Sequence, residues 1–197
     1  MSEKIINDEA LDIIFRTART RNGWQEKKVS STLVQAVYDL MKWGPTSANC
    51  SPARFVFVTS EAAKARLIPH LLPGNQGKVK AAPVTVIIGY DLEFYEKLPQ
   101  LFPHTDARSW FVGNAPLIET TAFRNSTLQG AYLMIAARAL GLDCGPMSGF
   151  SNEAVDREFF PGGKVKSNFI CAIGYGTDEN LFPRSPRLSF DEACEVV

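Results

Sequence analysis

The chain has 197 residues, of which 45% are hydrophobic and 21% are charged, and its formal net charge is zero. This length predicts a single domain over residues 1–197, with enough chain for a sizeable core. A net charge of zero gives no overall field that would attract nucleic acid or an anionic membrane. The longest apolar runs, such as residues 84–89, are too short to span a bilayer.

Acidic residues near the start of the sequence, Glu3, Asp8 and Glu9, are not typical of a signal or transit peptide. We therefore expect a cytoplasmic protein. The four cysteines are widely scattered without a Cys-x-x-Cys spacing, and neither His70 nor His104 is near a cysteine in sequence. This pattern predicts free thiols and no metal site.

Hydrophobic periodicity predicts helices that alternate with strands. We expect helices over residues 9–19, 31–41, 61–72, 116–140, 152–159 and 191–196, and strands over 55–59, 84–90 and 169–175. The helix over 116–140 is apolar on most sides, which favours a buried position, either central or between subunits. Residues 91–108 form a long aromatic connection, typical of a lid, a subunit contact or a surface excursion that covers the core.

Three connections are rich in small polar residues, and we expect loops at residues 44–51, 73–78 and 143–149. The first is also compatible with a simple helix-to-strand connector. Arginines lie near both chain ends, and guanidinium groups suit a phosphate. Neither a phosphate-binding glycine motif nor a Gly-x-Ser-x-Gly nucleophile motif is present. The combination favours a phosphorylated, flat cofactor over a protein nucleophile.

Four blocks carry a family resemblance. They are WGPTSANCSPAR at residues 43–54, LFPH followed by DARSWF within residues 101–111, TAFRNS at 121–126 and GPMSGF at 145–150. With these blocks in this order, the sequence resembles the nitroreductase family of FMN-dependent oxidoreductases, and within it the malonic semialdehyde reductase branch of uracil-nitrogen (pyrimidine) degradation. The resemblance implies an α+β fold, with a central mixed β-sheet flanked by helices, in an intertwined homodimer. FMN would bind between the subunits, and the helix near residues 125–140 would lie at their interface.

The resemblance also implies the cofactor-binding residues. The phosphate group would be bound by Arg19, Thr20, Arg184 and Arg187, with Arg21 nearby because Asn22 occupies the family's second basic position. The ribityl chain and flavin edge would meet Pro45, Thr46, Ser47 and Asn49; the pyrimidine end would meet Asn75 and Lys78; and the side near N5 would meet Pro146, Met147, Ser148 and Gly149. Taken singly, Arg187 and Lys78 also fit solvated surface residues, and Met147 fits a core residue.

The implied activity is an NAD(P)H-dependent reduction in which flavin N5, rather than a protein side chain, carries the hydride in a ping-pong relay. The branch implies reduction of malonic semialdehyde to 3-hydroxypropionate, with the substrate carboxylate near Arg108 or Arg124 and with Trp110 in the pocket wall. The alternatives are a broad nitroaromatic or quinone reductase, a non-catalytic flavin-binding protein and a non-flavin interaction domain. The sequence does not distinguish NADH from NADPH.

Overall fold

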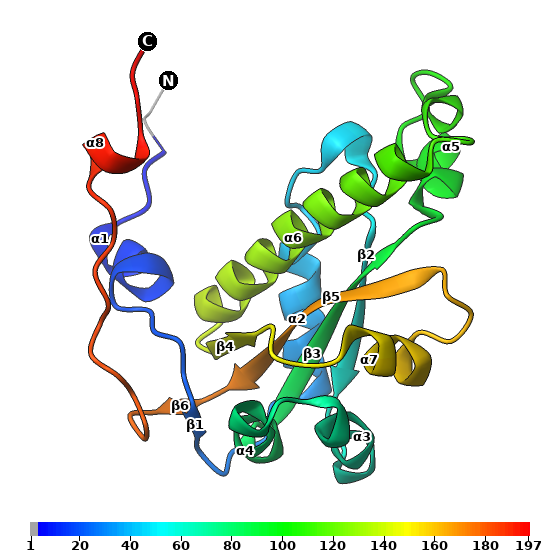
Figure 1. The fold of residues 1–197 in the computed structure, drawn as a ribbon. Helices are drawn as coiled ribbons and strands as arrows, with labels where there is room; N and C mark the ends of the chain where they lie inside the picture. The colour runs from blue at the N-terminus through cyan, green and yellow to red at the C-terminus, as the bar shows by residue number, and fades with distance from the viewer. Residues whose placement is uncertain (1–3) are drawn as a thin grey trace.

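The computed structural model describes residues 4–197 as a four-stranded sheet between two helical layers, with an arm formed by the two chain ends (Figure 1). The strands are β1 (Gly23–Trp24), β2 (Ala53–Val58), β3 (Val84–Asp91), β4 (Asp143–Met147), β5 (Val165–Gly174) and β6 (Gly176–Thr177). The α-helices are α1 (Asp8–Leu11), α2 (Ser31–Met41), α3 (Glu61–Leu67), α4 (Pro73–Ala81), α5 (Leu98–Leu101), α6 (Ala115–Ala139), α7 (Asn152–Phe159) and α8 (Phe190–Ala193). Short π- and 3₁₀-helices are η1 (Asp12–Arg16), η2 (Ser47–Asn49), η3 (Ile68–His70), η4 (Phe94–Lys97) and η5 (Ala107–Trp110).

The central sheet has the strand order β2-β3-β5-β4, and each neighbouring pair runs antiparallel. The expectation of a mixed sheet is therefore corrected for residues 4–197. The parallel pairing found in this part of the chain is a single isolated bridge between Thr20 and Cys144. That bridge joins the N-terminal segment to the edge strand β4. It brings the arm to the open edge of the sheet.

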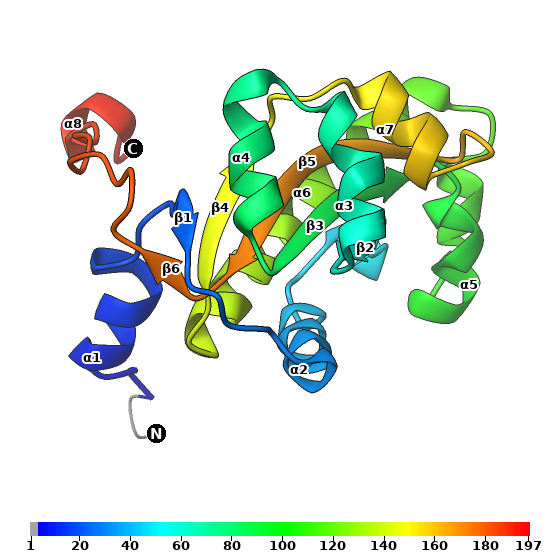
Figure 2. The ribbon, with the colours of Figure 1, turned by 90° about the horizontal axis from the view of Figure 1, so that it is seen from below.

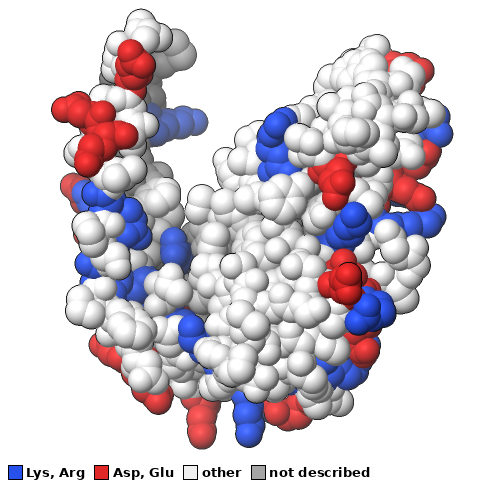
Figure 3. All heavy atoms as spheres, viewed as in Figure 1, with Lys and Arg blue, Asp and Glu red and all other residues white. Residues whose placement is uncertain are grey.

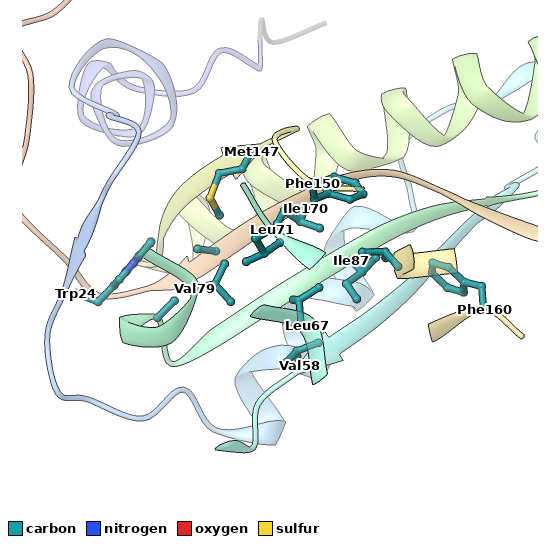
Figure 4. Packing of buried hydrophobic residues seen from close by; sticks show 13 residues of the cluster. Trp24, Val58, Leu67, Leu71, Val79, Ile87, Met147, Phe150, Phe160 and Ile170 are labelled. Atoms are coloured by element: carbon teal, nitrogen blue, oxygen red, sulfur yellow. The ribbon is translucent and has the colours of Figure 1, made fainter. Parts of the chain in front are cut away.

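Both faces of the sheet are covered by helices (Figure 2). Ile87 of β3 packs with α3, α4 and α7 on one face, while Val86 and Ile88 pack with α2 and α6 on the other. Figure 4 shows the first of these clusters, which reaches from Phe160 at one end of the sheet to Trp24 at the other. Burial on both faces explains why β3 reads as a continuous apolar run, because successive side chains of a strand point to opposite sides.

The long helix α6 organises the second layer. Gly130 allows a close approach to β5, since a Cβ at this position would lie 2.4 Å from the Phe169 ring. Asn125 and Gln129, both buried, accept hydrogen bonds from the backbone N–H groups of Ser47 and Ala53, each at 2.8 Å. The segment between α2 and β2 is thus fixed to the middle of α6, because buried backbone groups need partners.

Most predicted elements are confirmed, one expected loop is wrong, and a second is wrong for most of its length. Residues 73–78 belong to helix α4, which begins with Pro73 at its first position, where the missing N–H costs little. Residues 143–147 form β4, which pairs with β5 along the sheet edge. The helix expected over 9–19 is broken into α1 and the π-helix η1, which ends at Arg16.

The two chain ends lie side by side in the arm. The short strands β1 and β6 pair antiparallel, and beyond them η1 and the C-terminal segment both run away from the sheet (Figure 1). Within residues 4–197, no helix combines the length and the apolar character needed to cross a bilayer.

Candidate functional site

A pocket of about 560 Å³ lies where the arm meets the body. It is lined by Phe15, Ala18, Arg19, Thr20, Asn22, Lys78, Arg138, Leu181, Phe182, Pro183, Arg184, Ser185 and Arg187. Five of these side chains are cationic and none is acidic; we call this the cationic pocket. Figure 3 shows Lys and Arg side chains along the arm, at the edge of the hollow between arm and body.

The cations of this pocket contact backbone carbonyl groups. Arg19 donates to the carbonyl of Phe182, and Arg184 donates to the carbonyls of Arg16 and Ala18, both at 2.9 Å. Arg187 bonds carbonyls of its own segment, at 3.0 and 3.1 Å. A carbonyl satisfies an N–H donor and leaves the positive charge uncompensated.

None of these arginines has a carboxylate within 4.0 Å among the described residues, whereas most other arginines of residues 4–197 are ion-paired. Lys78, on α4, likewise has no ion pair in this part of the chain. The pocket is therefore a site of uncompensated positive charge. An anion that entered it would relieve the mutual repulsion of these cations.

Two neighbouring residues differ in their surroundings. Arg21 faces carboxylates: it pairs with Asp178, and its Nε lies 3.5 Å from Asp143. Asn22 lines the cationic pocket and donates to the carbonyl of Asn180 at 2.9 Å. The positive charge of Arg21 is thus balanced locally, while the pocket offers an amide at the next position.

The expected residues of α4 and β4 come together beside the cationic pocket. The Asn75 side chain donates to the carbonyl of Gly149 at 3.1 Å. A Cβ on Gly149 would lie 2.7 Å from Asn75 Nδ2, so the chain passes α4 closely here. Met147 is 9% exposed and its side chain points into the core near Trp24 (Figure 4). Pro146 is half-buried and Ser148 is exposed, so these two present polar backbone and hydroxyl groups at the surface.

The segment of residues 44–54, which we call the polar loop, has an unusual backbone. Ala48, Asn49 and Ser51 have φ values of 47°, 50° and 40°, a left-handed conformation that is uncommon outside glycine. Asn49 Nδ2 donates to the carbonyl of Leu101 at 2.8 Å, and the Thr46 hydroxyl accepts from Ser51 N–H at 3.1 Å. The loop is held in a defined shape, with Pro45 and Ser47 exposed.

Arg54 closes this loop. Its guanidinium donates to the carbonyl of Ser51 at 3.1 Å and to Asp91 Oδ2 at 2.5 Å. Arg54 therefore ties the C-terminal end of the loop to the end of β3, and its donors are directed at the protein.

The polar loop and the cationic pocket lie at different positions along α6, the loop at its middle and the pocket at its C-terminal end. Ser47 contacts Asn125 in the first half of the helix, whereas Arg138 belongs to its last turn. A rise of 1.5 Å per residue separates these two positions by roughly 20 Å. One chain by itself does not bring the two predicted halves of the cofactor site together.

The candidate substrate residues occupy different places. Arg108 makes two hydrogen bonds to Glu96, at 2.7 and 2.8 Å, and these bonds lower the pKa of that carboxyl. Trp110 is 50% exposed at the end of the same segment. Arg124 lines a groove of about 840 Å³ on the outer face of α6, together with Phe123 and Leu128.

Arg138 is the one basic residue among the lining residues that the sequence did not predict. Its signal is present in the sequence, because it is the one charged residue between Asn125 and Leu140 in an otherwise uncharged stretch. A charge in the last turn of a helix is usually explained by the helix dipole. The folding of the chain ends around it is not visible in the helix periodicity.

Comparison with known proteins agrees with this architecture. The model of the nitroreductase family matches residues 4–176. A protein from Burkholderia lata named "putative NADH dehydrogenase/NAD(P)H nitroreductase" is 61% identical over 191 residues, which cover 97% of this chain and 98% of that protein. A similarly named protein from Stenotrophomonas maltophilia is 62% identical over 188 residues, 95% of this chain and 96% of its own length.

Solved structures share the fold. A "putative nitroreductase in complex with FMN" from Exiguobacterium sibiricum superposes with a TM-score of 0.87 at 20% identity, and covers all of both chains. CLA-ER, an enone reductase of gut-bacterial fatty acid saturation, has a TM-score of 0.85 at 18% identity and covers 98% of this chain and 100% of its own. At such low identity these structures show only that the fold is shared. Membership of the family is shown by the family model and by the relatives above 60% identity. This chain belongs to the nitroreductase family.

Proposed function

We propose that this chain is an FMN-dependent NAD(P)H oxidoreductase. The observation that carries the proposal is the cationic pocket, with five basic side chains and no acidic residue in its lining. A flavin mononucleotide presents one phosphate dianion, which suits a group of uncompensated guanidinium and ammonium groups. The residues present therefore fit the phosphate end of FMN.

Within this proposal, the chain binds and orients the cofactor. Arg19, Thr20, Arg184 and Arg187 hold the phosphate, and Arg21 lies next to Thr20 in the chain, ion-paired with Asp178. Asn75 and Lys78 meet the pyrimidine end. Pro146, Ser148 and Gly149 line the opposite side, together with the backbone of Met147, whose side chain points into the core. The polar loop supplies Pro45, Thr46, Ser47 and Asn49. When bound, FMN would supply hydride-transfer chemistry between NADH or NADPH and an acceptor. The protein positions the reactants and excludes water.

A homodimer completes this site. The two halves of the predicted site lie roughly 20 Å apart along α6 in one chain. The outer face of α6 carries Leu117, Phe123 and Leu128, each at least 40% exposed, which favours burial against another surface. Two copies related by a twofold axis, with their α6 helices packed face to face and antiparallel, bring the polar loop of one chain to the cationic pocket of the other.

For the substrate we propose malonic semialdehyde, which is reduced to 3-hydroxypropionate. Arg124 is the better candidate for the substrate carboxylate because it has no ion pair among the described residues, whereas Arg108 is paired with Glu96. Arg108 would need to exchange its bonds with Glu96 for the substrate, and Trp110 would wall the pocket. The broader alternative is reduction of nitroaromatics or quinones, which the names of the similar proteins favour.

The test is a steady-state assay of the FMN-loaded protein with NADH and with NADPH. Malonic semialdehyde, a nitroaromatic compound and a quinone serve as acceptors. We expect kcat/KM to be highest for malonic semialdehyde. We also expect the protein to reduce this aldehyde much faster than free FMN does at the same concentration. If the protein reduces the aldehyde no faster than free FMN does, the proposed substrate is wrong. If NADH bleaches the bound flavin without oxygen but no acceptor is reduced, the protein binds flavin without being a reductase of these acceptors.

A further inference from the structure

We infer that Arg138, in the last turn of α6, binds the phosphate of FMN and makes the protein discriminate FMN from riboflavin. The inference rests on the proposed function and adds a residue from the helix layer to the binding site. The other cations of the pocket come from the chain ends and from α4. Arg138 comes from the element that also carries the outer apolar face.

Arg138 is positioned for an anion in the cationic pocket. Its side chain lines the pocket and is half-buried, and its Nη1 donates to the carbonyl of Ile14 at 3.3 Å. That is the one hydrogen bond found for its guanidinium within residues 4–197, and a guanidinium has five N–H donors. Most of its donors are thus available to a ligand.

The backbone of Arg138 is more firmly held than that of the arm. Leu133, Ala136 and Ala137, on the same stretch of α6, are buried against the sheet, whereas Arg184 and Arg187 lie on an exposed segment. Binding groups on packed helices are placed more accurately than groups on loops. The backbone of Arg138, like that of Lys78 on α4, is therefore held independently of the C-terminal segment that carries Arg184 and Arg187.

The helix end gives a second reason for a cation at this position. The C-terminus of a helix has a partial negative charge, which repels a phosphate. Arg138 lies in the last turn of α6, at the wall of the pocket. Its positive charge offsets that repulsion, so that the end of a 25-residue helix can border an anion site.

A structural role is the competing explanation, because the bond to Ile14 also ties η1 to α6. The two roles differ in which ligand they affect. Loss of a phosphate contact weakens the binding of FMN. It leaves the binding of riboflavin unchanged, because riboflavin lacks the phosphate. Loss of a structural tie disturbs the pocket for both flavins alike.

The experiment measures dissociation constants for FMN and for riboflavin by equilibrium quenching of flavin fluorescence, on the full-length protein freed of flavin. For Arg138→Gln we expect FMN to bind at least about tenfold more weakly, or 1.4 kcal/mol, with riboflavin unchanged. Arg138→Lys keeps the positive charge but removes the planar guanidinium that can donate two hydrogen bonds to a phosphate. We therefore expect a smaller loss of FMN affinity. Arg157→Gln is the matched control, since Arg157 is exposed on α7 and pairs with Glu153 at 3.7 Å.

The outcomes separate this inference from the proposed function. If the unaltered protein binds riboflavin as tightly as FMN, or binds neither flavin, the phosphate site itself is wrong. If the unaltered protein prefers FMN and the Arg138→Gln variant shows the same preference, the proposed role of Arg138 is wrong. The proposed phosphate site is then unaffected. Equal weakening of both flavins also overturns the inference, since it indicates a structural tie. Thermal unfolding of each variant checks that the fold is retained.

Discussion

Cys50, at the end of the polar loop, is a buried thiol that makes stability depend on pH. It is 1% exposed and packs in the aromatic cluster with Tyr90 and Phe94. Burial raises the pKa of its thiol from 9.0 to about 11. In the unfolded chain the thiol loses its proton first as the pH rises. The stabilisation that folding gains from keeping the Cys50 thiol protonated is therefore complete below about pH 9. It is lost progressively as the pH approaches 11.

We expect the free energy of unfolding in urea to fall between pH 8 and pH 10.5 as a consequence. Two pKa units correspond to about 2–3 kcal/mol. Cys50→Ala should show a flatter pH dependence, whatever its stability at pH 8. Cys194→Ala is the control, because Cys194 is exposed. An unchanged slope in Cys50→Ala would mean that another group, such as buried Cys171, dominates the alkaline loss.

Individual residues also show where sequence reasoning ends. Arg19, Arg184 and Arg187 were predicted as one group, and the structure brings them into one pocket. Arg21 and Arg108 look equivalent to them in sequence, yet each faces a carboxylate. An arginine is read from sequence as a charge, whereas its availability depends on the partner that the fold places beside it.

At the scale of elements, the contact of α6 with β5 sets how closely helix and sheet pack. A Cβ on Gly130 would lie 2.4 Å from Cζ of Phe169, closer than real contacts allow. We expect Gly130→Ala to destabilise the protein by about 1–3 kcal/mol, because the ring or the helix must shift. The measurement is urea unfolding at neutral pH.

Gly77 supplies the matched control for this substitution. It also lies within a helix, α4, and a Cβ there would meet nothing within 4 Å. Gly77→Ala should stabilise the protein by about 0.4–1 kcal/mol, since alanine has less conformational freedom to lose. If both variants shift stability in the same direction and by similar amounts, the close approach of α6 is not the cause.

The elements that the sequence predicts well are those with a strong hydrophobic period. Helix 116–140 and strand 84–90 match α6 and β3 within a residue at each end. Residues 73–78 and 143–149 were expected as loops because glycine and proline are common in both. Tertiary pairing decides these segments: β4 is a strand because it completes the edge beside β5, which local composition does not reveal.

For the molecule as a whole, the hydrophobic periodicity leaves the topology open, and the family resemblance, which implied a mixed sheet, did not predict the antiparallel one. The helical layers and the main strands follow from the pattern of apolar residues, but the antiparallel strand order and the arm do not. The candidate site draws on segments from both chain ends, α4, β4 and the polar loop. Such long-range assembly depends on side-chain fit across the core, and no single window of sequence encodes it.

The proposed dimer makes a prediction that one chain alone cannot fulfil. If each site takes its cationic pocket from one chain and its polar loop from the other, damage to the two halves can be separated. Arg187→Ala weakens the phosphate end, and Ser47→Trp blocks the flavin end at an exposed position. Each homodimer then has two defective sites.

Mixed dimers distinguish the two arrangements. In a dimer of one Arg187→Ala chain and one Ser47→Trp chain, one site has both lesions and the other has neither. After the two impaired variants are unfolded and refolded together, we expect about a quarter of the sites to regain the FMN affinity and NADH oxidation of the unaltered protein. Each variant refolded alone is the control. If every site lay within a single chain, each would keep one lesion, and the mixture would stay as inactive as its parents.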